Sequence, residues 1–391
     1  MRLFARRSEC HGVGHRGTQA LRHRNTRNAV GKMIYFDNAA TTYPKPPEVI
    51  KTMSRATVRY GANPGRGGHK MSYLTSEAVY ETRKRVAEFF GTDAPENVIF
   101  TKNCTEALNI VIKGLCVPGC RFICSSLDHN AVIRPLEALR RSGTADYDIA
   151  PVGKTDDETV ANFKRLLRSN TRAVICTGAS NVFGERLPTA KLARLAHENG
   201  ALFILDAAQT AGIVNIDMRR DEIDFLCTAG HKGLLRSYGA QGLLVIKFPT
   251  NISSSLIEGG TGSFSAVLSQ PEIYPDRFES GTLNVPGILS LGEGIRFVSD
   301  RGVSRIYKSE QGHIADIYKA LKNYSERSPV YGSVFLPKRV MSLFCHLMWT
   351  VFTANRRLHF LQMTILPSEQ VSIAHRRLTK RTELFTKVQS E

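Results

Sequence analysis

The chain has 391 residues, of which 42% are hydrophobic and 23% charged, so it can bury a large core. This composition excludes a wholly disordered chain and a small disulfide-stapled protein. The formal net charge of +18 by itself favours a partner such as nucleic acid or an anionic membrane.

The positive charge is concentrated at the two ends of the chain. Residues 1–33 carry a net charge of +7 and residues 331–391 carry +6, which leaves +5 for residues 34–330. Such a balance is ordinary for an enzyme, so no nucleic-acid partner is predicted. No apolar stretch reaches the roughly 18 residues that a membrane span needs, so we predict no membrane association. The eight cysteines form no CxxC pair, which favours the reducing cytoplasm and predicts no metal site.

Residues 1–32 show no apolar periodicity, and Met33 stands directly before the first patterned segment. We interpret residues 1–32 as a basic extension, either disordered or added by a start assigned too early. An organelle transit peptide is the alternative, because the segment is rich in Arg and poor in acids.

An alternation of helix-like and strand-like segments begins after residue 75. The spacing of apolar residues predicts helices over 75–90, 105–115, 130–142, 156–167 and 288–298, and short apolar runs predict strands over 98–101, 121–125, 173–177, 201–205 and 225–228. Apolar strands separated by amphipathic helices predict an α/β fold, a mostly parallel sheet with helices on both faces. Ligands bind such sheets at the carboxyl ends of the strands.

The pattern changes twice in the C-terminal third. Residues 249–290 loosen into Gly-rich loops, and after residue 330 the alternation stops. We therefore expect a large domain over residues 33–290 and a smaller domain whose first part is residues 291–330. Residues 33–50 are expected to pack near the smaller domain. Residues 331–391 form a divergent basic tail, which leaves the smaller C-terminal domain incomplete or aberrant.

Two titratable residues follow neighbouring predicted strands. Asp206 comes directly after the apolar run 203–205, and Lys232 follows the run 225–228. A lysine among small residues, opposite a buried acid, suits Schiff-base formation, because burial keeps its amine neutral. Pyridoxal phosphate (PLP) needs both groups, a lysine for its aldehyde and an acid for its pyridinium nitrogen. Taken alone, Asp206 is equally consistent with a helix N-cap.

Two further segments fit this cofactor. The segment 102–106 lies at a strand-to-helix turn, where backbone N–H groups and the Thr105 hydroxyl can hold a phosphate. His129 follows the next predicted strand and can lie over a pyridine ring, although a lone histidine there is more often a solvated turn residue.

Six motifs occur in the order and spacing of a known family: Ile34–Thr42, Asn103–Asn109, Asp128–Asn130, Ser180–Gly184, Asp206–Gln209 and Gly230–Lys232. From about residue 33 to about 330 the chain resembles the cysteine desulfurases, a branch of the fold type I, class V aminotransferase-like enzymes. The resemblance implies that residues 33–290 are the PLP-binding large domain. It also implies a homodimer.

The resemblance implies roles for individual residues. Lys232 would form the Schiff base, Asp206 would pair with the pyridinium nitrogen, and His129 would stack on the ring and take part in proton transfer. The remaining implied contacts are Gln209 with the phenolic oxygen, Asn181 with the ring oxygen and the substrate carboxylate, Cys104, Thr105, Thr228 and His231 with the phosphate, and Thr282 with the phosphate of the neighbouring subunit.

The implied reaction converts L-cysteine to L-alanine and passes the sulfur as a persulfide to an acceptor protein, for iron–sulfur cluster assembly or other sulfur transfer. The family's nucleophilic cysteine and substrate-carboxylate arginine normally lie in the C-terminal part. Cys345 is the one cysteine of the tail, and its apolar setting does not resemble the family's loop. Three alternatives therefore stay open: an inactive desulfurase, another class V enzyme (selenocysteine lyase, epimerase or transaminase), and a non-catalytic PLP-fold protein.

Overall fold

The computed structural model describes residue 35 and, in the compact unit that begins at Asp37, residues 37–65, 67–236, 241–247, 252, 254–264 and 266–327. The expectations for residues 1–32 and 331–391, Cys345 included, lie outside the described residues. None of the described helices combines the length and the apolar character that a membrane crossing demands.

The centre of the fold is a sheet whose strands lie in the order β1-β7-β6-β5-β4-β2-β3. Its described strands are β1 (Val98–Thr101), β2 (Cys120–Ser125), β3 (Ala145–Ala150), β4 (Thr171–Thr177), β5 (Leu202–Asp206), β6 (Phe225–Ala229) and β7 (Gly242–Ile246). All neighbouring pairs are parallel except the two that involve β7, which is antiparallel to both β1 and β6. The predicted mostly parallel sheet is confirmed.

The described helices are α1 (Pro47–Arg59), α2 (Lys70–Phe90), α3 (Cys104–Gly114), α4 (Asn130–Arg141), α5 (Asp156–Leu166), α6 (Thr189–Glu198), α7 (Val285–Arg301) and α8 (Val303–Arg327). Local signals set their ends. At α5, Thr155 accepts a hydrogen bond from the Glu158 amide, and α2 stops at Gly91, whose φ of 71° suits glycine. Helix α7 starts three residues before the predicted Ile288, because the Asn284 side chain caps the Gly287 amide.

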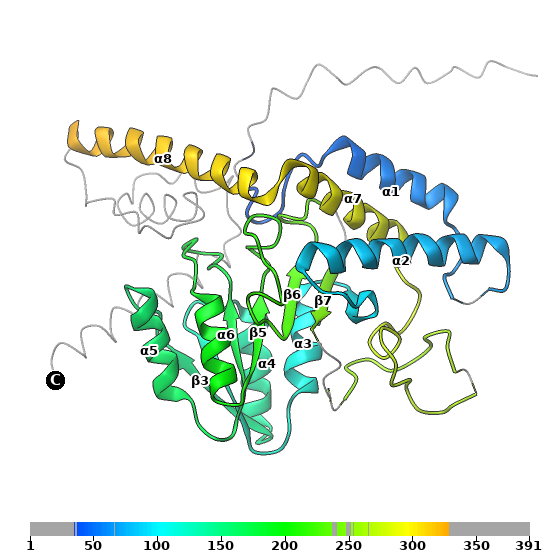
Figure 1. The fold of residues 1–391 in the computed structure, drawn as a ribbon, viewed down its shortest axis with the longest axis horizontal. Coiled ribbons are helices and arrows are strands. Elements are labelled where there is room, and N and C mark those ends of the chain that lie inside the picture. Colours follow the sequence, from blue (N-terminus) through cyan, green and yellow to red (C-terminus); the bar gives the residue numbers. More distant parts are fainter. Residues whose placement is uncertain are drawn as a thin grey trace, which may run out of the picture. The chain divides into compact units, whose positions relative to one another are not determined.

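Alternate residues of the strands face two separate cores. Phe203 and Leu205 of β5 pack with residues of α2, α6 and α7 on one face, whereas Ile204 packs with residues of α3 and α4 on the other. On the first face α1, α2 and α7 lie side by side (Figure 1). Helices therefore cover both faces, and the carboxyl ends of the parallel strands remain the place where polar side chains can gather.

A buried ion pair ties the loop before α7 to the edge of the sheet. Arg83 of α2 and Glu279 are 5% and 8% exposed, and Nη1 of the arginine lies 2.8 Å from Oε1 of the glutamate. The same oxygen accepts a hydrogen bond from the Phe100 amide at 2.6 Å. The carboxylate thus joins α2, β1 and the loop that leads to Thr282.

Removing this carboxylate is expected to destabilise the fold strongly. Glu279→Ala leaves the Arg83 guanidinium buried without its carboxylate partner, so the free energy of unfolding in urea should fall by about 3 kcal/mol. Glu81→Ala, which removes an exposed ion pair with Lys84 on α2, is the control and should change it little. Equal losses in the two variants would contradict the structural role of Glu279.

Candidate active site

The predicted site residues follow the carboxyl ends of neighbouring strands. Cys104 and Thr105 begin α3 after β1, His129 follows β2, and Asn181 follows β4. Asp206 is the last residue of β5 with Gln209 in the turn after it, Thr228 lies in β6, and His231 and Lys232 follow β6. Strands β1 and β6 end at the same level on opposite sides of β7, because Thr101 and Ala229 both pair with Gly242 of β7.

Asp206 and Cys104 are in direct contact. The carboxylate is 3% exposed, and its Oδ1 accepts hydrogen bonds from the Ala208 amide at 3.0 Å and from the Cys104 thiol at 3.5 Å. Neither bond uses Oδ2. Burial and the neighbouring Asp206 raise the pKa of the Cys104 thiol well above its usual range, so this cysteine stays a neutral donor.

Helix α3 presents its N-terminus to the site. The Asn103 side chain accepts from the Glu106 amide at 2.9 Å and thereby fixes where the helix begins. Amides of a helix's first turn have no acceptor within the helix, and the helix dipole favours an anion in front of them. Thr105, exposed in this first turn, adds a hydroxyl, so the end of α3 suits a phosphate.

Two glycines let the loop that carries Lys232 approach the turn after Asp206. A Cβ on Gly233 would lie 2.3 Å from the Ala211 carbonyl oxygen, and a Cβ on Gly212 would lie 2.3 Å from the Gly233 carbonyl oxygen. Gly212 also has a φ of 82°. Any side chain at either position would push the two loops apart, so the approach of Lys232 to the Asp206 turn depends on both glycines.

The charge of Lys232 acts on residues from three segments. Burial raises the pKa of both Asp37 and Cys104, and the positive charge of Lys232 partly offsets each increase. It also adds to the burial that lowers the pKa of His231. The amine therefore lies within electrostatic reach of the α3 start, where Cys104 contacts Asp206.

His129 is held by its own helix. Its Nδ1 accepts a hydrogen bond from the Ala131 amide at 3.1 Å and so caps α4. A neutral ring with Nδ1 as acceptor carries its proton on Nε2, which fixes the tautomer. The preceding residue, Asp128, is buried and accepts bonds from the amide and the hydroxyl of Ser125, both at 2.6 Å, which shape the turn between β2 and α4.

His231 is expected to stay neutral across the physiological range. Burial lowers its pKa to about 4, and Lys232, Lys45 and Arg236 act in the same direction. Its ring resonances should therefore not titrate between pH 5 and 8, which NMR with His231→Gln for assignment can check. Below its usual pKa of 6.5 the unfolded ring takes up a proton that the folded ring refuses, so stability should fall as the pH drops from 6.5 to 4. A midpoint near 6.5 would contradict the buried setting.

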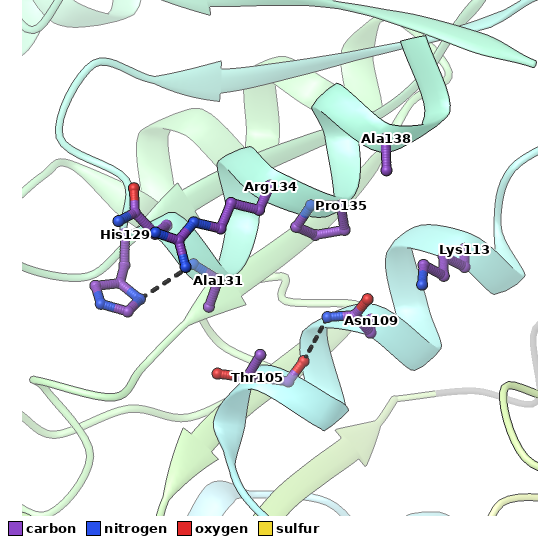
Figure 2. Close-up of a pocket in the computed structure, with 9 residues that line it drawn as sticks. Thr105, Asn109, Lys113, His129, Ala131, Arg134, Pro135 and Ala138 are labelled. Atoms are coloured by element: carbon purple, nitrogen blue, oxygen red, sulfur yellow. Dashed lines mark hydrogen bonds between the residues drawn. The ribbon is translucent and has the colours of Figure 1, made fainter. Parts of the chain in front are cut away.

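A groove of about 310 Å³ opens between α3 and α4, with Thr105 and His129 in its lining. Figure 2 shows Thr105 and Asn109 on α3 and Arg134 and Pro135 on α4 bordering it. Lys113 and Arg134 give it a positive charge, which the sequence interpretation did not assign. Their spacing of 21 residues carries no local signal, because only the packing of α3 against α4 brings them to one groove.

The other predicted residues take different positions. Gln209 donates from Nε2 to the Ala39 carbonyl oxygen at 3.4 Å, and the Thr228 hydroxyl donates to the Ala207 carbonyl oxygen at 3.2 Å. Asn181 is half-buried in the turn after β4, and Thr282 is exposed in the loop before α7. For these four residues, as for the other predicted site residues, the contacts with cofactor and substrate remain predictions.

The residues present fit PLP on three counts. Asp206 keeps both of its hydrogen bonds on Oδ1, so Oδ2 can face a pyridinium nitrogen. The start of α3 supplies donors for a phosphate. Lys232 supplies an amine for the aldehyde. An acid, an anion-binding helix end and an amine on one sheet edge are the groups that this cofactor requires.

The chain is similar to proteins of one family. The profile of the aminotransferase class-V family matches residues 34–343. A protein of Pyrococcus abyssi described as "Probable cysteine desulfurase" is 32% identical over 289 residues, which cover 72% of this chain and 70% of that protein. One of Methanothermobacter thermautotrophicus with the same description is 31% identical over 317 residues, 76% of each chain.

Solved structures agree with these relatives. The apo structure of a cysteine desulfurase from Thermococcus onnurineus NA1 matches with a TM-score of 0.67 and 28% identity, over 79% of this chain and 77% of that one. A structure described as "SspA in complex with cysteine" matches with a TM-score of 0.58 and 25% identity, over 68% and 72% of the two chains. The chain therefore belongs to the class-V aminotransferase family and, within it, to the cysteine desulfurase family.

Proposed function

We propose that this chain is a PLP-dependent cysteine desulfurase, which converts L-cysteine to L-alanine and passes the sulfur on as a persulfide. One observation carries the proposal: Asp206, Lys232 and the start of α3 gather at one edge of the sheet, in a chain related to cysteine desulfurases. The substrate and the site roles come from that relationship and from the chemistry of these groups.

The residues divide the work of the reaction. PLP, when bound, supplies an electron sink for the bonds broken in the amino acid. Asp206 Oδ2 would hold the proton on the ring nitrogen, and the Thr105 hydroxyl with the first amides of α3 would hold the phosphate. The Lys232 amine would carry protons to and from the substrate. His129 would stack on the ring and take part in proton transfer through Nε2, because its Nδ1 is held by the Ala131 amide.

The described cysteines do not include a suitable nucleophile. Attack on the substrate sulfur needs a thiolate, whereas Cys104 is buried, contacts Asp206 and has a strongly raised pKa. Burial and the neighbouring Cys120 raise the pKa of Cys116 to about 11. Cys345 lies outside the described residues. This observation favours one second candidate, another class V reaction that needs no thiolate, such as epimerisation or transamination.

The proposal includes a homodimer in the cytoplasm that hands sulfur to an acceptor protein for iron–sulfur cluster assembly. Support for the dimer comes from the loop before Thr282, where Leu268 is fully exposed and Phe264 and Val267 are 58% and 55% exposed. Apolar side chains gathered on one loop commonly mark an interface. In such a dimer Thr282 would reach the phosphate of the neighbouring subunit.

The test is turnover of L-cysteine by the purified full chain loaded with PLP. Equal amounts of alanine and sulfide, released in the presence of a dithiol, are expected, and Cys345→Ser should abolish the sulfide if the tail holds the nucleophile. Bound PLP without alanine would overturn the desulfurase proposal. Racemised or deaminated amino acids in the same assay would identify the second candidate.

A further inference from the structure

A segment before α1 is hydrogen-bonded to the loop that carries Lys232. We call residues 41–45 the N-terminal strap. Its Thr42 hydroxyl donates to the Lys232 carbonyl oxygen at 2.9 Å, and its Lys45 amine donates to the His231 carbonyl oxygen at 2.5 Å. Thr41 Oγ1 lies 3.3 Å from the same carbonyl oxygen and 3.0 Å from His231 Nδ1. Main-chain groups of the two residues at the centre of the loop are thus held from a distant part of the sequence.

The loop needs such support. Leu235 has a φ of 58°, a conformation that residues other than glycine rarely adopt, and strained backbone persists only where surrounding contacts hold it. Inside the loop the Lys232 carbonyl oxygen accepts from the Leu235 amide at 2.9 Å, so Thr42 adds its bond to the acceptor that already closes this turn. The strap contact and the strained turn share one carbonyl group.

The Lys45 bond is charge-assisted. Burial lowers the pKa of Lys45 to about 8, helped by Arg236, so the amine is mostly protonated at pH 7. A cationic donor makes a stronger hydrogen bond to a carbonyl than a neutral one does. Just before the strap, the Ala39 carbonyl oxygen accepts a hydrogen bond from Gln209 in the turn after Asp206. Residues 39–45 therefore contact both loops, the one that carries the acid and the one that carries the amine.

We infer that Thr42 and Lys45 are positioning residues, which fix the main chain of His231 and Lys232 so that the Lys232 amine is held toward the Asp206 side of the site. The inference rests on the proposed role of Lys232 in binding PLP. It assigns a role to Thr42 of the Ile34–Thr42 motif and to Lys45, and the resemblance to cysteine desulfurases gave neither residue a role. If the strap only anchored the segment before α1 to the sheet, loss of its hydrogen bonds would change neither the position of the Lys232 amine nor PLP binding.

The experiment compares Thr42→Val, which loses the hydroxyl at nearly constant shape, with Thr42→Ser, which keeps it. Thr57→Val is the matched control, since its hydroxyl makes a similar bond to the Met53 carbonyl on exposed α1. Two readouts are measured on full-length chains: the dissociation constant for PLP, and amide hydrogen exchange of Leu235 and Arg236 in the cofactor-free protein. Thr42→Val should weaken PLP binding about tenfold and speed this exchange about tenfold, an effect of about 1.4 kcal/mol.

Thr42→Ser and Thr57→Val should match the wild type in both readouts, and Lys45→Met should behave like Thr42→Val. The inference would be overturned if Thr42→Val exchanged these amides and bound PLP as the wild type does. It would also be overturned if Thr42→Ser showed the same weaker PLP binding and faster exchange as Thr42→Val. If the wild-type chain takes up no PLP, the proposed function fails, and exchange alone then decides for the strap or against it. A global loss of stability is recognised by faster exchange in the Phe203 and Phe225 strands, and would also count against a local role.

Discussion

Lys232→Ala should lose the visible absorption band of PLP bound through a lysine and should turn over substrate about 10⁴-fold more slowly, the upper range for a group that moves protons at the reacting atoms. The reason is chemical, since alanine offers neither an amine for the aldehyde nor a proton carrier. Borohydride trapping of PLP followed by peptide mapping measures the first effect, and product release measures the second. Lys51→Ala on exposed α1 is the control for a lost positive charge.

The variant also tests a specific competitor. Lys45 is half-buried close to His231, and with a pKa of about 8 it is the more reactive kind of amine. A trapped adduct on Lys45 in the wild-type chain would show that the strap, and not the loop after β6, supplies the Schiff base. An adduct on Lys232 alone, lost in Lys232→Ala, agrees with the site as described.

Asp206→Asn should lower turnover about 10³-fold, the upper cost of removing one electrostatic stabiliser of a reaction. The amide keeps the shape and can still accept from Cys104 and the Ala208 amide, but it has no negative charge to hold a proton on a ring nitrogen. The measurement is kcat for the PLP-loaded variant, with cofactor content checked so that loss of binding is not mistaken for loss of rate. Asp93→Asn, an exposed carboxylate paired with Arg219, is the control. Equal rates for wild type and Asp206→Asn would remove Asp206 from the mechanism.

Strands β1, β2, β4, β5 and β6 could be predicted from the sequence, because each is a short, mainly apolar run, whereas the buried strand β7 between β1 and β6 was not predicted. Residues 173–177, 201–205 and 225–228 lie in β4, β5 and β6 almost residue for residue. Edge strand β3 was missed because the exposed Asp146 and the half-buried Asp148 break the apolar run; both pair with Arg121 of β2. Helix α1 was missed because it buries only Val49 and Ala56.

The candidate site likewise contains residues that could be predicted from the sequence and contacts that could not. Asp206, Lys232 and Thr105 could be predicted, because Asp206 directly follows an apolar run and the other two lie a few residues after one, where α/β folds place ligand groups. The strap contacts could not, since most of them join side chains to main-chain carbonyls, and every residue has such a carbonyl whatever its side chain. Cys104 illustrates the intermediate case: the motif placed it at the site, but its contact with Asp206 depends on β1 and β5 being held three strands apart in one sheet.

The strap also has a consequence for the order in which the protein is made. Thr42 and Lys232 are separated by 190 positions. A ribosome adds about 5–20 residues per second, so roughly 10–40 s pass between the synthesis of Thr42 and the synthesis of the Lys232 carbonyl that it binds. Contacts of such long sequence separation form late in folding, because their loop-closure entropy is repaid only after the intervening strands have assembled. The nascent chain should therefore acquire its capacity to capture the cofactor only after the sheet is complete.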